Sequence, residues 1–205
     1  MKILLATQNQ GKVKELQEML SDTQIDVLSL RDIENWEDVE ETGSTFAENA
    51  SLKARVAAER TGYIALADDS GLEVDALNGA PGVYSARYAG EPKDDERNND
   101  KLLKALEKVP DEERTARFRC ALVIATPDGR EYLTEGTVEG RISRMRRGKD
   151  GFGYDPLFFM SDFGRTMAEL TVIQKNKVSH RAQAFQKAIP FLKELAQKSK
   201  TIKNE

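Results

Sequence analysis

Two adjacent acids, Asp68 and Asp69, are the residues of this sequence with the strongest potential for chemistry. They follow residues 63–67, an apolar run typical of a strand that is covered on both faces. Ligands of open α/β sheets gather beyond the carboxyl ends of strands, so we expect the two carboxylates at such an edge. Neighbouring side chains there point in opposite directions, so one acid can face a metal ion while the other supports it. The alternative is a solvated turn, because Asp, Ser and Gly favour turns.

A second acidic pair, Glu40 and Glu41, comes just before a predicted helix. Together with Asp68 or Asp69 it could form a metal site made only of oxygen ligands. The sequence has one cysteine and one histidine, which excludes an internal disulfide and metal sites that need several Cys or His ligands. Mg²⁺, or alternatively Mn²⁺, fits such a site. The alternative is that these acids only stabilise the N-terminus of the helix.

Residues 7–12 form a polar turn between a predicted strand and a predicted helix. Free N–H groups at the helix start, together with Lys12, suit a phosphate group. The turn does not have the Walker A sequence. Lys53 lies on the helix that follows the acidic pair and could also reach a phosphate, or it could be an ordinary exposed lysine.

The segment Gly151-Phe152-Gly153-Tyr154-Asp155-Pro156 combines glycines with two aromatic residues and an acid. Phe152 or Tyr154 could stack on a nucleobase, or both could belong to the core beside a tight turn. Ser179-His180-Arg181 opens the last predicted helix, and Lys175 lies shortly before it. Arg181 could donate to a carbonyl or phosphate oxygen, or the segment could be only a helix start with two surface residues.

Alternating strands and helices must position these side chains. Hydrophobic periodicity predicts strands at 2–7, 25–30, 63–67, 72–76, 117–126, 131–142 and 157–160, the sixth interrupted at Gly136 and Gly140. Helices are predicted at 12–20, from the capping box Thr45–Glu48 to about Arg60, at 100–109, and after Ser179 with a kink or restart at Pro190; 89–99 and 144–156 are predicted loops. These elements indicate a mixed α/β domain whose central sheet is flanked by helices, with a cleft between two lobes.

The composition narrows the function further. The 205 residues carry 31 Lys and Arg against 35 Asp and Glu, a net charge of −4, which argues against a protein that grips nucleic acid. No apolar run approaches the ~20 residues of a membrane span, and the N-terminal run is too short for a signal peptide. We therefore expect a soluble cytoplasmic protein whose partner is a small molecule and which binds no membrane.

The chain resembles the inosine/xanthosine triphosphate pyrophosphatases (dITP/XTP pyrophosphatases), enzymes that sanitise the nucleotide pool. Matching blocks occur in the family's order from residue 3 to about residue 195. They are Thr7-x-Asn9-x-x-Lys12, Glu41-Thr42-Gly43-x-Thr45-Phe46-x-Glu48-Asn49-Ala50, Ala67-Asp68-Asp69-Ser70-Gly71-Leu72, Gly79-Ala80-Pro81-Gly82-Val83-Tyr84-Ser85-Ala86-Arg87, Gly151-Phe152-Gly153-Tyr154-Asp155-Pro156 and Ser179-His180-Arg181.

The resemblance implies hydrolysis of ITP, dITP and XTP to the monophosphate and pyrophosphate, with Mg²⁺, in a homodimer. It also implies an elongated fold with the active site between two lobes, here a single domain over residues 1–197. A frayed tail over 198–205 is expected from its place at the chain end.

The same resemblance assigns roles to single residues. Asp69 would be the proton acceptor and a metal ligand, Glu41 the other metal ligand, and Asp68 and Lys53 their support. The residues implied for the phosphates and sugar are Thr7, Gln8, Asn9, Gln10, Gly11, Lys12, Ser70 and Lys175. Those implied for the base are Phe152, Gly153, Tyr154, Asp155, His180 and Arg181.

Two other functions stay open at this point. A metal-dependent phosphatase with Asp68 or Asp69 as nucleophile would release orthophosphate through a covalent intermediate. A nucleotide sensor would use the same pocket without turnover.

Overall fold

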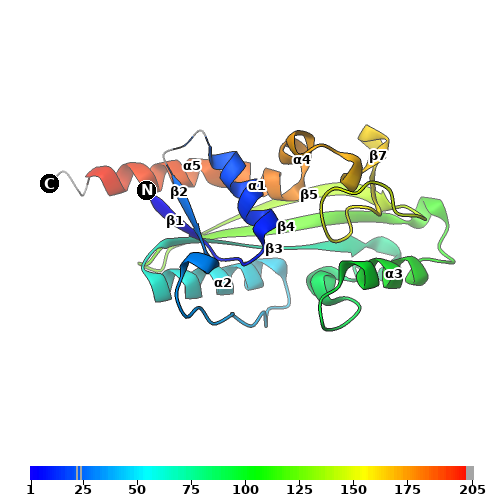
Figure 1. The fold of residues 1–205 in the computed structure, drawn as a ribbon, viewed down its shortest axis with the longest axis horizontal. Coiled ribbons are helices and arrows are strands. Elements are labelled where there is room, and N and C mark those ends of the chain that lie inside the picture. The colour runs from blue at the N-terminus through cyan, green and yellow to red at the C-terminus, as the bar shows by residue number, and fades with distance from the viewer. Residues whose placement is uncertain (22, 24, 202–205) are drawn as a thin grey trace. The chain divides into compact units, whose positions relative to one another are not determined.

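The computed structural model describes residues 1–21, 23 and 25–201, and within them seven strands form one sheet in the order β2-β1-β3-β4-β5-β6-β7 (Figure 1). The strands are β1 (Lys2–Leu5), β2 (Asp26–Ser29), β3 (Ile64–Val74), β4 (Thr115–Ala125), β5 (Glu131–Ile142), β6 (Phe158–Met160) and β7 (Arg165–Thr166). The helices are α1 (Gln10–Leu20), α2 (Phe46–Thr61), α3 (Asp95–Ala105), α4 (Val172–Val178) and α5 (His180–Thr201). β1 runs parallel to β2 and β3, whereas β6 is antiparallel to β5 and β7. The predicted mixed α/β fold is therefore confirmed.

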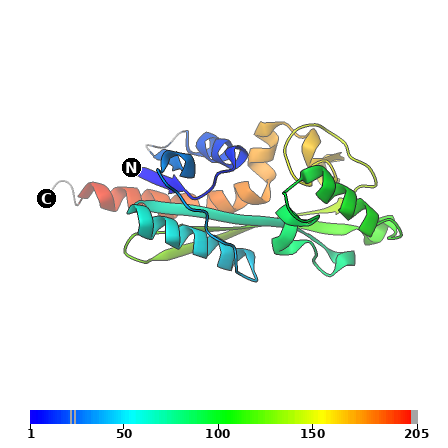
Figure 2. The same cartoon turned by 60° about the horizontal axis from the view of Figure 1, so that its bottom comes forward.

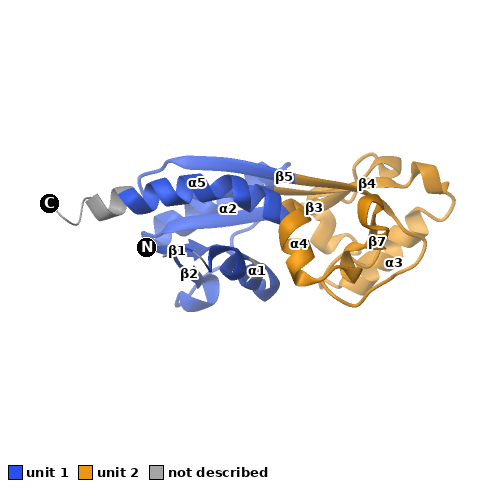
Figure 3. Ribbon diagram, turned by 90° about the horizontal axis from the view of Figure 1, so that it is seen from above, with its two compact units in different colours: residues 1–69, 121–136, 181–205 blue, residues 70–120, 137–180 orange. Residues whose placement is uncertain are grey.

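The chain divides into two compact units, which Figure 3 shows in two colours. Unit 1 comprises Met1–Asp69, Ala121–Gly136 and Arg181–Glu205, and unit 2 comprises Ser70–Cys120 and Thr137–His180. The three long strands β3, β4 and β5 contribute residues to both units. The chain passes from unit 1 to unit 2 between Asp69 and Ser70, in the middle of β3.

In unit 1, helices cover both faces of the sheet. α2 lies on one side of β3, and α1 lies on the other (Figures 1 and 2). The face of α2 that the periodicity predicts to be buried is confirmed, since Phe46, Ala50, Ala54, Ala57 and Ala58 are all buried. Alanines on this face let the helix backbone approach the sheet closely.

Local capping signals set the ends of the helices. The predicted capping box is confirmed: Thr45 Oγ1 accepts from Glu48 N at 3.2 Å, and a Glu48 carboxylate oxygen accepts from Thr45 N at 3.1 Å. α1 begins at Gln10, two residues before the predicted start, because Asn9 caps it. α5 begins after Ser179 as predicted and continues through Pro190 without a restart.

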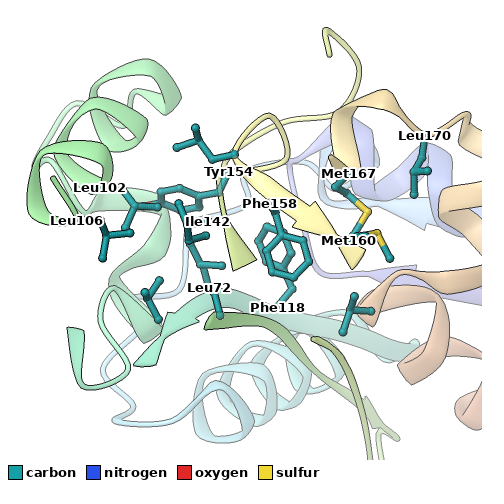
Figure 4. Close-up of a cluster of buried hydrophobic side chains, with 14 residues drawn as sticks. Leu72, Leu102, Leu106, Phe118, Ile142, Tyr154, Phe158, Met160, Met167 and Leu170 are labelled. Carbon is teal, nitrogen blue, oxygen red and sulfur yellow. The ribbon is translucent and has the colours of Figure 1, made fainter. Parts of the chain in front are cut away.

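The core of unit 2 lies between its strands and α3 (Figure 4). Leu72 comes from β3, Phe118 from β4 and Ile142 from β5, and Leu102 lies on α3. Phe118 and Phe158 pack against each other with ring centroids 4.5 Å apart.

Several predicted boundaries in unit 2 are wrong. α3 starts at Asp95 rather than near residue 100, because the Asp94 carboxylate accepts from Arg97 N at 3.0 Å and begins the helix inside the predicted loop. β5 is continuous, so neither Gly136 nor Gly140 interrupts it. A Cβ on Gly140 would lie 2.6 Å from the Phe159 carbonyl oxygen, so this glycine permits the close approach of β6.

The C-terminal helix ends later than the predicted tail begins. α5 continues to Thr201, and residues 202–205 lie outside the described residues, so fraying there stays a prediction. The division into a domain over 1–197 and a tail over 198–205 also stays a prediction. Among the described residues, no helix has the length and apolar character that a membrane crossing requires.

Candidate active site

Asp68 and Asp69 lie in the middle of β3, not in a turn after it. The predicted end of the strand at residue 67 is therefore wrong. The neighbouring strand β1 does end here: Leu5 pairs with Leu66, and Ala6 N donates to Leu66 O at 2.7 Å. The two acids thus lie just past the carboxyl end of β1. They are at the carboxyl end of a strand, as predicted, but that strand is the neighbouring β1 and not β3.

Asp68 is a buried carboxylate held by two cations from different helices. Its Oδ2 lies 2.8 Å from Lys12 Nζ on α1 and 3.3 Å from Arg181 Nε on α5. Burial alone raises the pKa of Asp68, but Lys12, Arg181 and Lys53 outweigh it and hold this pKa well below the ordinary range. Apolar side chains line a small cavity beside this group, namely Leu5, Leu16, Met19, Leu122 and Phe185. Asp68 is therefore ionised, and it fixes α1 and α5 to the sheet.

Asp69 takes its partners from α2, on the opposite face of the sheet from α1. Asn49 Nδ2 donates to Asp69 Oδ2 at 3.1 Å, and Lys53 Nζ lies 3.6 Å from Asp69 Oδ1. Asn49 and Lys53 are four residues apart and so lie on one side of the helix. The two acids point to opposite faces, as predicted, and this arrangement lets β3 continue through them because each carboxylate finds polar partners.

Lys53 joins Asp69 to Glu41. Its Nζ lies 2.6 Å from Glu41 Oε1 and also donates to the Asp68 carbonyl oxygen at 3.0 Å. Burial lowers the pKa of Lys53, but Asp69, Glu41 and Asp68 outweigh it, and the net shift is upward. The pKa of Asp69 is raised, first by burial and then by Glu41, against the opposing effects of Lys53 and Asn49. Of the predicted acidic pair, Glu41 is the member that contacts this group, and Glu40 is exposed.

The carboxylate oxygens around Lys53 are suitable ligands for a hard divalent cation. Carboxylate oxygens of Glu41 and Asp69 both lie within 4 Å of one ammonium nitrogen, so they converge on a point that a cation could occupy. Within the part of the chain that the structure describes, no group of three or more His, Cys, Asp or Glu side chains could hold a metal ion. Mg²⁺ is commonly bound by one or two carboxylates, with water and substrate phosphate oxygens as its other ligands, so two carboxylates suffice.

The predicted phosphate turn has less free backbone than its sequence indicates. Asn9 Oδ1 accepts from Gly11 N at 2.9 Å and from Lys12 N at 3.4 Å, which occupies N–H groups that we expected to face a phosphate. Thr7 Oγ1 accepts from Asn9 N at 3.2 Å. The Gln8 side chain donates to Asp38 Oδ1 at 2.7 Å, and Gln10 is exposed at the helix start. A phosphate here would depend mainly on the Lys12 side chain.

In unit 2, Asp155 organises the aromatic turn. Its Oδ2 accepts from Lys175 Nζ at 2.7 Å and from Phe152 N at 3.1 Å. Lys175 Nζ also lies 5.0 Å from the centre of the Phe152 ring. Gly153 has φ +61°, and its N–H donates to Asp95 Oδ2 at 2.7 Å. Lys175, predicted to hold phosphates and sugar, thus contacts the turn predicted to hold the base.

Tyr154 and Phe152 differ in exposure. Tyr154 is buried in the core of unit 2, where its hydroxyl donates to Ser85 O at 2.8 Å (Figure 4). This burial fits the alternative of a core aromatic, and a role of Tyr154 in stacking on a base stays a prediction. Phe152 is 36% exposed and remains the aromatic residue of this turn that could stack.

Three further predicted site residues are His180, Arg181 and Ser70. His180 is buried and stacks on Phe118 with ring centroids 4.9 Å apart. Arg181 follows it in the chain and contacts Asp68 of unit 1. Ser70 is half-buried in β3 directly after Asp69 and is the first residue of unit 2.

Sequence reasoning assigned no role to Asn49, although it is fully buried against Asp69. One signal was available. Asn49 is a polar residue between Phe46 and Ala50 on the buried face of α2, where an unpartnered amide would be costly.

Comparisons with known proteins agree with this fold. Residues 3–191 match the sequence profile of the Ham1 family. A dITP/XTP pyrophosphatase of Desulforamulus reducens is 57% identical over 195 residues, which are 95% of this chain and 97% of the relative. One from Geobacter sulfurreducens is 55% identical over 89% of this chain and 92% of the relative. The solved structure of a HAM1 protein from Coxiella burnetii is similar with a TM-score of 0.87 and 46% identity, covering 95% of this chain and 99% of that one. The chain therefore belongs to the Ham1 family.

Proposed function

We propose that this chain hydrolyses the purine nucleoside triphosphates ITP, dITP and XTP to the monophosphate and pyrophosphate. Relatives that are 57% and 55% identical over nearly their whole length are dITP/XTP pyrophosphatases. The observation that carries the proposal is the position of Lys53 Nζ, 2.6 Å from Glu41 Oε1 and 3.6 Å from Asp69 Oδ1. Two carboxylates that meet in this way suit a reaction on a polyphosphate that needs a divalent cation.

Glu41 and Asp69 would hold Mg²⁺, with Mn²⁺ as an alternative. When bound, this cation would neutralise the charge that develops on the phosphate oxygens and on the leaving pyrophosphate. The residues of the chain would supply the remaining steps.

Asp69 would orient a water molecule and accept its proton during attack on the α-phosphorus. The bond from the α-phosphorus to the bridging oxygen then breaks, and pyrophosphate leaves. The raised pKa of Asp69 makes it a better base than an ordinary carboxylate. Asp68 has its pKa held low by cations, so it is a poor proton acceptor. Environments that move the pKa values of two acids apart separate their roles.

Lys12 would bind phosphate oxygens, and we propose the same role for Arg181 in place of the contact with the base that the resemblance implies. Both contact one oxygen of Asp68, which places two cations from different helices beside each other before substrate arrives. Such preorganised charges stabilise a transition state without reorganisation at the moment of reaction. Lys53, which lies on α2, would offset negative charge on the phosphate oxygens from the other face of the sheet.

The purine would stack on Phe152, which Asp155 and Lys175 hold in place. Selectivity would depend on the 6-oxo group of the base. A buried donor that faces the amino group of adenine loses its partner, which costs about 1–3 kcal/mol. We further propose that the protein is cytoplasmic and forms a homodimer. Light scattering on the purified protein would test the homodimer.

Product identification tests the activity. The purified protein is incubated with dITP and Mg²⁺ in water enriched in heavy oxygen, and the products are analysed by phosphorus NMR and mass spectrometry. We expect pyrophosphate and a monophosphate that carries the heavy oxygen, because water attacks the α-phosphorus. Orthophosphate with a covalent aspartyl phosphate would instead indicate the phosphatase. Intact dITP would indicate a sensor.

A further inference from the structure

Asn49 is fully buried on α2, and both ends of its side-chain amide form hydrogen bonds. Its Oδ1 accepts from the backbone N–H of Gly43 at 2.7 Å. Its Nδ2 donates to Asp69 Oδ2 at 3.1 Å. The side chain therefore links β3 to the segment that precedes α2.

The contact with Gly43 determines which way the amide points. A backbone N–H can only donate, so the atom opposite Gly43 must be the amide oxygen. The NH₂ group then faces Asp69, where a carboxylate can only accept. A Cβ on Gly43 would lie 2.7 Å from Asn49 Oδ1 and 2.7 Å from Glu48 Cβ, so a residue with a side chain here would have to shift one of them.

Gly43 is two residues after Glu41, so the bond from Asn49 restrains the backbone that carries the second carboxylate. We infer that Asn49 is a positioning residue that ties the Glu41 segment to Asp69 and holds the two carboxylates at the separation that one divalent cation requires. This inference rests on the proposed function, and it concerns a residue that would touch neither metal nor substrate.

Lys53 contacts the same two carboxylates, but it cannot keep them in place when a cation binds. An ammonium group repels a divalent ion and competes with it for the same oxygens. Asn49 is neutral and donates to Asp69 Oδ2, whereas Lys53 is nearest to Oδ1, so the Asn49 hydrogen bond leaves Oδ1 for the cation. The two α2 residues thus have different tasks: Lys53 balances charge, and Asn49 maintains geometry.

The test uses two variants and a matched control. Asn49→Leu keeps the number and branching of the side-chain heavy atoms and removes both hydrogen bonds without adding charge. Asn49→Asp keeps an acceptor for Gly43, removes the donor to Asp69 and places a second carboxylate beside it. The control is Asn98→Leu, because Asn98 is also buried on a helix, and its amide likewise accepts from a backbone N–H (Ala89, 2.7 Å) and donates with its NH₂ group (to Ala86 O, 3.1 Å).

Mn²⁺ affinity without nucleotide is measured by electron paramagnetic resonance of the free ion, and kcat and KM are measured with dITP. We expect Asn49→Leu to weaken Mn²⁺ binding about 10–100-fold, the usual effect of removing a partner of a metal ligand. Asn98→Leu should leave Mn²⁺ affinity unchanged even where it lowers Tm. Asn49→Asp should lower kcat at least about tenfold with little change in KM.

Wild-type Mn²⁺ affinity in Asn49→Leu, or equal weakening in Asn98→Leu, would overturn the inference. If Asn49→Leu does not fold, Asn49→Asp decides, and a wild-type kcat in that variant would overturn it. A wild-type protein that leaves dITP intact would instead refute the proposed function, and the Mn²⁺ titration would still decide the role of Asn49.

Discussion

Replacing Lys53 by methionine tests whether the Glu41 and Asp69 carboxylates converge on one cation. The variant keeps most of the side-chain volume but leaves the two acids facing each other. The side chains of Lys53, Glu41 and Asp69 are 15%, 25% and 12% exposed, so the pairs are shielded from solvent without being fully buried. Removing one partner of a buried ion pair costs about 3–5 kcal/mol, and the lower end applies here, about 3 kcal/mol. In a chain of this size that loss lowers Tm by about 6–12 °C.

The assay is thermal unfolding without nucleotide over a series of Mg²⁺ concentrations. In Lys53→Met the divalent ion no longer competes with the ammonium group, so we expect Mg²⁺ to raise Tm more than it does in the wild type. At about 100 times its Kd a ligand contributes about 2.7 kcal/mol, enough to restore most of the loss. The variant should recover stability but not full activity, because the charge of Lys53 near the substrate is still missing.

Lys12→Met is the matched control. Lys12 forms an ion pair of 2.8 Å with Asp68, and its side chain is 16% exposed, close to the 15% of Lys53. Its loss should lower Tm without making Tm more sensitive to Mg²⁺, because Arg181 still pairs with Asp68. An equal Mg²⁺ response in wild type and Lys53→Met would refute the reasoning, since it would mean that no cation takes the place of the ammonium group.

The same geometry gives three further predictions. Asp69→Asn should lower kcat at least about 10²-fold, because the proton acceptor is lost; steady-state kinetics measures this, and circular dichroism should show a folded protein. Asp68→Asn should lower Tm at neutral pH. The folded pKa of Asp68 lies below its unfolded value, so its stabilisation is present above the unfolded pKa and is lost as pH falls toward the folded one. The difference in Tm between this variant and wild type should therefore narrow below about pH 4. Phe152→Ala should raise the KM for dITP about fivefold or more through lost stacking, whereas Tyr154→Phe should cost about 1 kcal/mol of stability and leave KM unchanged.

Some signals that act over a few residues were read correctly from the sequence, whereas the N-caps at Asn9 and Asp94 were missed. The capping box of Thr45 and Glu48 and the alanine face of α2 depend only on local spacing, and the structure has both. The mixed α/β fold follows from the alternation of such elements. The predicted end of the strand at residue 67 is wrong because the turn preference of Asp68 and Asp69 is overridden by partners far away in the chain. Arg181 is 113 residues from Asp68, and no local pattern announces that contact.

Buried polar contacts account for two other differences. Tyr154 and Phe152 are two residues apart in one glycine-rich segment, and the sequence gives both the same potential for stacking. The structure separates them because Ser85 offers a carbonyl oxygen that a buried tyrosine hydroxyl requires. Asn49 was missed for the same reason, since its value depends on Gly43 and Asp69, which lie in two other segments.

The balance of charge among six contacting side chains in unit 1 explains why nucleotide binding and binding of a divalent cation should depend on each other. The cations Lys12, Lys53 and Arg181 contact the acids Asp68, Asp69 and Glu41, so the charges of these six side chains balance. A triphosphate that enters this shielded environment competes with these carboxylates for Lys12, Lys53 and Arg181, so the protein compensates its negative charge only in part. An unpaired charge in a shielded, low-dielectric environment is costly. The additional positive charge that pairs with the triphosphate must therefore arrive together with the substrate. The carboxylates that neutralise the cations without nucleotide are also the ligands that a divalent cation would use. Removing one of these carboxylates should therefore affect both the stability of the protein and its affinity for the metal ion.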